Sequence, residues 1–249
     1  MVNTFNKEKK SNINLSIDAY KDSKHGKVYK RYEFVHEKIK NRISKITNPK
    51  VFDIGCGDAS FICYLKKKHP NAKYYGLEPN QDLIDKARSN HFLDDVELKN
   101  GDACKFKIRE RFNIIIMSGV LSIFDEIDAP IRNMIKHLLP GGYGYIFGGF
   151  CTEDIDVLVR FRNNYLKSTT WESGLNMFSL KTVKGMLKNY ASRIQIHEFK
   201  IDIGLRKQKD PIRTYSLMTQ ENGRIIVNGA NIIREFYLIE FRKKLKVKQ

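Results

Sequence analysis

The sequence contains few cysteines for its length. Its 249 residues include four, at Cys56, Cys63, Cys104 and Cys151. This number is too small for the disulfide framework of a small secreted domain. None of the four has the CxxC spacing that is typical of a zinc site. We therefore expect reduced thiols and no metal site.

Long apolar runs are also missing. No stretch of eighteen apolar residues occurs, and residues 1–16 contain no apolar segment of the kind found in secretory signals. These absences predict no membrane span and a cytoplasmic location. The chain is nevertheless 41% hydrophobic and 11% aromatic, which is enough for a full core and excludes a disordered chain.

Positive charge is in excess and unevenly distributed. The 45 Lys and Arg residues exceed the 28 Asp and Glu residues by 17. Residues 1–50 carry a net charge of +8, residues 51–150 a net charge of zero, and residues 205–249 a net charge of +7. A basic total is typical of nucleic-acid-binding proteins, but surface lysine also serves solubility alone. A nucleic-acid partner therefore stays open and is not favoured.

From Pro49 onward, short apolar segments alternate with amphipathic ones. The patterns predict strands at residues 51–54, 72–77, 96–98, 112–117 and 143–150, and helices at residues 59–69, 81–90 and 126–139. Strands that alternate with helices of this length form parallel sheets through right-handed crossovers. We expect an α/β fold with a doubly wound, mostly parallel sheet.

The two ends of the chain differ from this pattern. Helix-like stretches within residues 1–48 predict a helical N-terminal cap, ahead of a core at residues 49–150. The remaining part, residues 151–249, is expected to belong to the same domain. It is predicted to hold helices at 153–167 and 179–191, strands at 192–202 and 235–241, and between these strands a hairpin of 213–219 and 224–229.

A glycine turn follows the first predicted strand, in the segment from Asp53 to Ala59. Glycines directly after a buried strand permit a tight turn, let a ligand approach the backbone and lead into a helix with free N–H groups. The dinucleotide fingerprint needs a small residue three positions after its second glycine, and here Ser60 occupies that position. Asp53 at the strand tip would repel a pyrophosphate, so an acid at this position suits a cationic ligand.

Residues 48–150 resemble a class I S-adenosylmethionine-dependent methyltransferase with a Rossmann-like core, of the small-molecule type. The resemblance implies that Asp53, Gly55, Cys56 and Gly57 form the loop beneath the methionine part of S-adenosyl-L-methionine. Ala59 stands where the family usually has a third glycine. The expected product of the cofactor is S-adenosyl-L-homocysteine.

The resemblance extends to the next two strand ends. It implies that Glu78 binds both ribose hydroxyls, because one carboxylate can accept two hydrogen bonds, and that Pro79 begins the helix beyond. Asp102 and Ala103 match the pair that reads the adenine, one through its side chain and the other through its backbone N–H.

The fourth strand end completes the resemblance. Ser118, Gly119 and Val120 match the segment that borders the sulfonium. The family also implies a seven-stranded sheet whose last strand, here residues 235–241, runs antiparallel to the others. The whole fold is then a doubly wound α/β sheet with a helical N-terminal cap and an added C-terminal hairpin.

The residues after the fourth strand indicate which kind of atom is methylated. They lack the Asn/Asp-Pro-Pro-aromatic motif of amino-adenine methyltransferases and the nucleophilic cysteine of cytosine-carbon enzymes. We therefore expect O-methylation of a small polar metabolite at a hydroxyl. A weak likeness of RTYSL and IIVNG to methyltransferases encoded with polysaccharide genes adds a sugar or sugar conjugate as an example. The alternatives are an RNA-modifying methyltransferase that uses the basic flanks, and a non-catalytic module of the same fold.

A hydroxyl acceptor would benefit from a general base. His25 in the cap and Asp125 beyond the fourth strand are the candidates. Aromatic, basic and polar residues from the cap and from the later turn are expected to contact the acceptor; they are Tyr20, Tyr29, Arg31, Tyr32, Trp171, Asn176 and Phe178. No metal-ligand spacing accompanies them.

Overall fold

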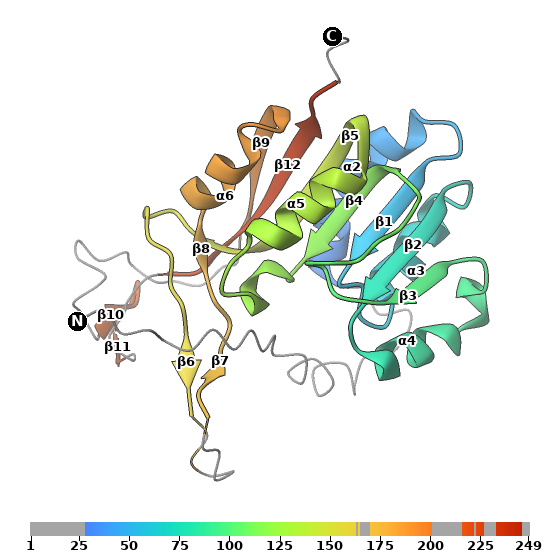
Figure 1. Ribbon diagram of the computed structural model, residues 1–249. Helices are drawn as coiled ribbons and strands as arrows, with labels where there is room; N and C mark the ends of the chain where they lie inside the picture. The colour runs from blue at the N-terminus through green and yellow to red at the C-terminus, as the bar shows by residue number, and fades with distance from the viewer. Residues whose placement is uncertain are drawn as a thin grey trace.

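The computed structural model describes residues 28–162, 164, 170–200, 216–221, 223–226 and 233–245. Its centre is a sheet in the order β3-β2-β1-β4-β5-β12-β9 (Figure 1). These strands are β1 (Lys50–Ile54), β2 (Lys73–Glu78), β3 (Glu97–Asn100), β4 (Phe112–Ser118), β5 (Leu138–Cys151), β9 (Ala191–Phe199) and β12 (Glu235–Lys243). A short eighth strand, β8 (Phe178–Ser179), pairs with the end of β5.

The strand directions agree with the predicted fold class. The first five strands pair in parallel, and β12 runs antiparallel to both β5 and β9. The four residues Ile114 to Met117 of β4 are completely buried because helices cover both faces of the sheet. The expected seven-stranded sheet with an antiparallel last strand is therefore confirmed, with β8 as a short addition.

Helices cover the two faces in separate groups. One face packs against α2 (Lys30–Ser44), α3 (Ser60–Lys68) and α4 (Gln81–Arg88) through apolar residues such as Ile39, Ile62 and Ile84. The other packs against α5 (Asp128–His137) and α6 (Leu180–Leu187) through Ile131, Met134 and Val183. Each helix presents apolar residues to the sheet at helical spacing, so its burial follows from its sequence. None of the described helices is long and apolar enough to cross a membrane.

The predicted helix at residues 153–167 is wrong over its described part. Residues 153–159 are bends and extended chain, with a bridge from Val157 to Met177, and the short strand β6 (Arg160–Phe161) follows. β6 pairs antiparallel with β7 (Glu172–Ser173). Ile155, Val157, Val159 and Phe161 recur with a period of two, and three of the four residues at positions 154, 156, 158 and 160 are charged, so the segment carries a strand pattern as well as helical spacing. Figure 1 shows β6 and β7 projecting beyond the sheet edge where β1, β2 and β4 end.

Other predicted elements have their expected types. The hairpin is present as β10 (Ser216–Met218) and β11 (Arg224–Ile226), which pair antiparallel. Of the N-terminal cap, α2 is described, and the helix-like stretch at residues 14–22 lies outside the described residues. Two short 3-10 helices, η2 (His91–Leu93) and η3 (Leu121–Ile123), lie in the connections that follow α4 and β4. The connections at the ends of β1 to β4 form the candidate site.

Candidate active site

The turn after β1 has the backbone geometry that its glycines indicated. Gly55 and Gly57 have φ angles of 75° and 57°, a region that favours glycine. The N–H groups of Gly55 and Cys56 both donate to the carbonyl of Leu77 at the end of β2, at 2.7 and 3.0 Å. A Cβ on Gly55 would lie 2.3 Å from Cγ2 of Val120, so the turn packs directly against the residue after β4. The first and fourth strand ends are therefore in contact.

Asp53 is a buried acidic residue near the end of β1, at this edge of the sheet. Its side chain is 3% exposed, and its Oδ1 has no hydrogen-bond partner among the described residues. Burial raises the pKa of this carboxyl to about 8, and the nearby charge of Glu78 contributes in the same direction. A buried carboxylate without a partner is unfavourable in the isolated protein and favours a positively charged or hydrogen-bond-donating ligand.

Glu78 joins the first two strand ends. Its Oε2 accepts a hydrogen bond from the N–H of Gly57 at 2.9 Å, and its Oε1 accepts one from the N–H of Asn80 at 3.1 Å. Burial raises the pKa of Glu78, and these two backbone hydrogen bonds act in the opposite direction. Asn80 caps α4 by accepting from the N–H of Asp82, so Pro79 lies just before the helix cap and not within the helix. Each carboxylate oxygen retains a further lone pair for a ligand hydroxyl.

Asp102 and Ala103 lie in the loop after β3. Oδ1 of Asp102 accepts a hydrogen bond from the N–H of Cys104 at 2.8 Å, and the Asp102 side chain is partly exposed. The carbonyl of Ala103 accepts a hydrogen bond from Nδ2 of Asn133 at 3.1 Å, and the same Nδ2 donates to the carbonyl of Phe106 at 3.2 Å. Asn133 on α5 thus fixes a loop that has no regular structure of its own.

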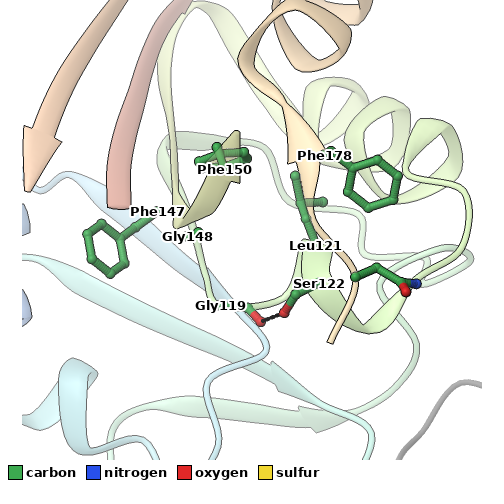
Figure 2. A pocket seen from close by; sticks show the side chains of 9 residues that line it. Gly119, Leu121, Ser122, Phe147, Gly148, Phe150 and Phe178 are labelled. Carbon is green, nitrogen blue, oxygen red and sulfur yellow. Dashed lines mark hydrogen bonds between the residues drawn. The ribbon is translucent and has the colours of Figure 1, made fainter. Parts of the chain in front are cut away.

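Gly119 forms the fourth strand end. It has a φ angle of 76°, its N–H donates to the carbonyl of Phe147 at 2.8 Å, and a Cβ at this position would meet nothing within 4 Å. Oγ of Ser122 donates to its carbonyl at 3.1 Å. Gly119 lies at the edge of a small hollow (Figure 2), lined by Gly119, Leu121, Ser122, Phe147, Gly148, Gly149, Phe150, Asn176 and Phe178. None of these lining residues has an ionisable side chain.

The structure therefore brings four strand ends together at one edge of the sheet. Residues 52–143 match the family model described as a methyltransferase domain. This part of the chain, which carries the four strand ends, is therefore similar to methyltransferase domains. S-adenosyl-L-methionine is the cofactor of such domains, and the unpartnered Asp53 carboxylate, the available lone pairs of Glu78 and the open backbone at Gly119 fit its cationic and hydroxyl-bearing parts.

Two O-methyltransferases are similar in sequence to part of this chain. The chain is 26% identical over 99 residues to a fatty-acid O-methyltransferase of Mycolicibacterium smegmatis, which is 39% of this chain and 36% of the relative. It is 20% identical over 154 residues to a malonyl-[acyl-carrier protein] O-methyltransferase of Bacillus cytotoxicus, which is 62% of this chain and 54% of the relative. The matches thus cover about a third to a half of these relatives.

A solved structure extends the similarity in fold. The N-terminal domain of EvdMO1 with S-adenosyl-L-homocysteine bound has a TM-score of 0.56 and 12% identity, covering 86% of this chain and 80% of that one. At this identity the likeness concerns the fold alone. Because it covers 86% of this chain, it extends beyond residues 52–143.

Asp125, in the loop after η3, lies in a network of contacts. Its Oδ2 lies 2.5 Å from Nη2 of Arg160, and its Oδ1 accepts hydrogen bonds from Asn176 at 3.0 Å and Ser173 at 3.3 Å. These contacts join the loop after η3 to the β6–β7 hairpin. The predicted role of Asp125 as a base is not tested by them, but each of its oxygens already has a partner.

Asn176 is the centre of the same network. It is fully buried, its Nδ2 donates to the carbonyl of Phe124 at 2.7 Å, and its Oδ1 accepts from the N–H of Val159 at 2.8 Å. Phe178, two residues further on, lines the hollow, whereas Trp171 is 64% exposed beside Arg162. Asn176 and Phe178 therefore lie at the hollow, and Trp171 lies on the surface of the projecting hairpin.

The described residues of the N-terminal cap form an aromatic cluster. The guanidinium of Arg31 lies 4.6 Å from the ring of Tyr29 and 5.1 Å from the ring of Tyr32, which stacks on Phe61 at 4.9 Å. Burial raises the pKa of Tyr32 to about 12, opposed by Arg31, and the charge of Asp53 adds to the rise. Tyr32 thus packs α2 onto α3 close to the site. Tyr20 and His25 lie outside the described residues.

Three contributions to the site were not predicted. Asn133 fixes the Asp102 loop, Asp58 in the turn before α3 accepts hydrogen bonds from the N–H and Oγ of Ser60, and Arg234 reaches across the end of β5. The position of Asp58 directly after Gly57, inside the glycine turn, is the signal that could have revealed it. Asn133 and Arg234 act through contacts that are distant in sequence, so no local pattern marks them. The described residues contain no group of three or more ligands able to hold a metal ion.

Proposed function

We propose that this protein transfers the methyl group of S-adenosyl-L-methionine to an oxygen atom of a small molecule. The observation that carries the proposal is the buried Asp53 carboxylate without a partner, at an edge where four strand ends meet. Such a group is costly in the isolated protein and becomes favourable when a cationic ligand binds beside it.

The residues of the edge divide the recognition of the cofactor among them. Asp53 would attract the positively charged methionine end, Glu78 would accept hydrogen bonds from ribose hydroxyls, and the Asp102–Ala103 loop would read the adenine. The cofactor supplies an activated methyl group on a sulfonium. The main task of the protein is then to hold an acceptor oxygen in line with that methyl group, which lowers the barrier by orientation.

The names of the curated relatives support oxygen as the methylated atom, since both are O-methyltransferases. The hollow beside Gly119 is the acceptor site that we propose, because it adjoins the strand end that would border the sulfonium. A hydroxyl acceptor, including a sugar or sugar conjugate, remains the prediction from the sequence, with His25 or Asp125 as its base.

A transfer assay tests this proposal. Purified protein is incubated with methyl-labelled S-adenosyl-L-methionine and, in parallel, with a panel of sugars, alcohols, carboxylic acids and bulk RNA. We expect label to enter a small-molecule oxygen compound and S-adenosyl-L-homocysteine to accumulate with it. Label in RNA alone, with binding that weakens steeply as salt rises, would replace the proposal with the RNA-modifying alternative.

A further inference from the structure

Arg234 lies next to the hollow beside Gly119, which we propose as the acceptor site. A Cβ on Gly149 would be 2.4 Å from Cδ of Arg234, and Nη2 of Arg234 donates to the carbonyls of Leu175 at 2.6 Å and Asn176 at 3.0 Å. Its side chain therefore crosses the end of β5 from β12 to the segment before β8. Gly149 and Asn176, two of its contacts, line the hollow beside Gly119.

The charge of Arg234 is not matched within the described part of the chain. No described carboxylate forms an ion pair with it, and its Nε and Nη1 donate no hydrogen bond to a described residue. The side chain is half-buried, and burial lowers its pKa. A guanidinium that is partly removed from water retains its charge and gains most from an anion such as a carboxylate, to which Nε or Nη1 can donate.

The hollow beside this charge is apolar. Leu121, Phe150 and Phe178 contribute buried side chains to it, and none of its lining residues has an ionisable side chain. A hydroxyl acceptor must lose a proton during transfer, and the lining residues within the described part of the chain offer no base for it. A carboxylate is already deprotonated at neutral pH and needs none.

We propose that the acceptor is an amphipathic carboxylic acid whose carboxylate is bound by Arg234 and whose apolar part packs against the apolar side chains at the hollow beside Gly119. The inference rests on the proposed function. A carboxylate oxygen forms the new bond to the methyl carbon as the bond from that carbon to sulfur breaks. Sulfur keeps the electron pair and becomes the neutral thioether of S-adenosyl-L-homocysteine. The product is a methyl ester, and no proton moves.

Calorimetric titrations of the full chain test this assignment. The protein is first titrated with S-adenosyl-L-homocysteine, and the saturated complex is then titrated with butanoate, octanoate and dodecanoate and with the alcohols of the same chain lengths. We expect at least one carboxylate to bind tenfold or more tightly than its alcohol, about the factor given by 1.4 kcal/mol. Equal binding of every acid and alcohol pair, or no binding of any acid, would overturn the inference.

Variants assign the preference to Arg234. Arg234→Gln should bring the affinity for the acid down to that for the alcohol, whereas Arg234→Lys should keep part of the preference because it keeps the charge. Arg132→Gln is the matched control, because Arg132 pairs with Asp128 on the exposed surface of α5. A preference that persists in Arg234→Gln would refute the role of Arg234.

The first titration separates this inference from the proposed function. If S-adenosyl-L-homocysteine binds and no carboxylate is preferred, only the inference fails. If S-adenosyl-L-homocysteine does not bind, the proposed function fails as well. The affinity of each variant for S-adenosyl-L-homocysteine also reports whether the variant is folded, and the comparison of acids with alcohols in the unchanged protein does not depend on any variant.

Discussion

Asp53 combines two properties that seldom occur together, complete burial within a parallel sheet and an oxygen without a partner. Its neighbours in the sheet are Gly76 on β2 and Ile116 on β4, and neither offers a side-chain hydrogen bond. Such a residue lowers the stability of the ligand-free protein and raises the stability of the complex with a ligand. Its effect on the free energy of unfolding should therefore depend both on pH and on whether the ligand is bound.

Asp53→Asn should stabilise the ligand-free protein at alkaline pH. The folded pKa of about 8 lies above the unfolded value of 3.8, so the contribution of the carboxyl is full at low pH and is lost as pH rises toward 8. At pH 8.5 we expect the thermal midpoint of the variant to exceed that of the unchanged protein by at least about 4 °C. The difference should shrink at pH 5, and S-adenosyl-L-homocysteine should raise the midpoint of the variant less than that of the unchanged protein. A lower midpoint at pH 8.5 would contradict this explanation.

Gly55 is a second residue whose role can be isolated. Gly55→Ala places a methyl group 2.3 Å from Val120 in a backbone region that alanine rarely adopts. We expect its affinity for S-adenosyl-L-homocysteine to fall at least about tenfold, or 1.4 kcal/mol, with partial recovery when Val120→Ala removes the collision. Gly185→Ala is the control: Gly185 lies inside α6 with nothing within 4 Å, so it should gain about 0.5–1 kcal/mol of stability and bind normally.

The sequence predicts a helix or strand most accurately where the apolar residues of a segment follow a single periodicity. Each of β1, β2 and β4 is a short apolar run followed by a turn residue, and each appears within one residue of its predicted bounds. The segment after β5 contains both helical spacing and a period of two, and there tertiary contacts decide the outcome. Asn176 bonds to Phe124 and Val159, and these distant contacts hold residues 153–162 in an extended path.

The same difference separates the parts of the site. The cofactor residues occupy strand ends that the alternation of elements had already located, so their convergence followed from the sequence. Arg234, directly before β12, and Asn133 on α5 reach the site through contacts with carbonyl oxygens. Any residue with a suitable side chain could make such contacts, so the sequence could not identify them.

Asn176→Ala should loosen the β6–β7 hairpin and leave the cofactor edge intact. The substitution leaves the carbonyl of Phe124 and the N–H of Val159 without their partner, at a cost of about 1–3 kcal/mol each where they stay buried. Hydrogen exchange should speed up in residues 157–161, 172–177 and 121–125 and stay unchanged in β1 and β4. Faster exchange throughout the sheet would show instead that Asn176 supports the whole fold.

At the scale of the molecule, the site and the excess charge occupy different parts of the chain. Residues 51–150, which supply the four strand ends, are neutral, whereas the flanks carry +8 and +7. The basic total therefore does not describe the environment of the cofactor. Arg234 belongs to the basic C-terminal flank, but it is half-buried beside the hollow. We expect its charge to affect acceptor binding more than the exposed lysines do, because water screens exposed charges.

Three histidines that are buried or partly buried should weaken the fold as pH falls and so oppose the effect of Asp53. Burial lowers the pKa values of His36, His69 and His137, and the 3.0 Å contact between the Nε2 atoms of His36 and His69 lowers that of His36 further. Their stabilising contribution is full above the unfolded value of 6.5 and is lost as pH falls through the lower folded values. As pH falls from 7.5 to 5, the urea midpoint of the double variant His36→Gln, His69→Gln should therefore rise relative to that of the unchanged protein, because the contribution of Asp53 is common to both. A constant difference between the two midpoints would exclude the histidine pair as a source.

The most direct test of the cofactor site is a calorimetric titration of the unchanged protein and of Asp53→Asn and Glu78→Gln with S-adenosyl-L-homocysteine at pH 8.5. The site described above predicts binding of one molecule per chain to the unchanged protein. It predicts loss of at least about 1.4 kcal/mol of binding free energy, a tenfold change, in each variant, with circular dichroism unchanged. Equal affinity in all three proteins, or no binding to the unchanged protein, would contradict it.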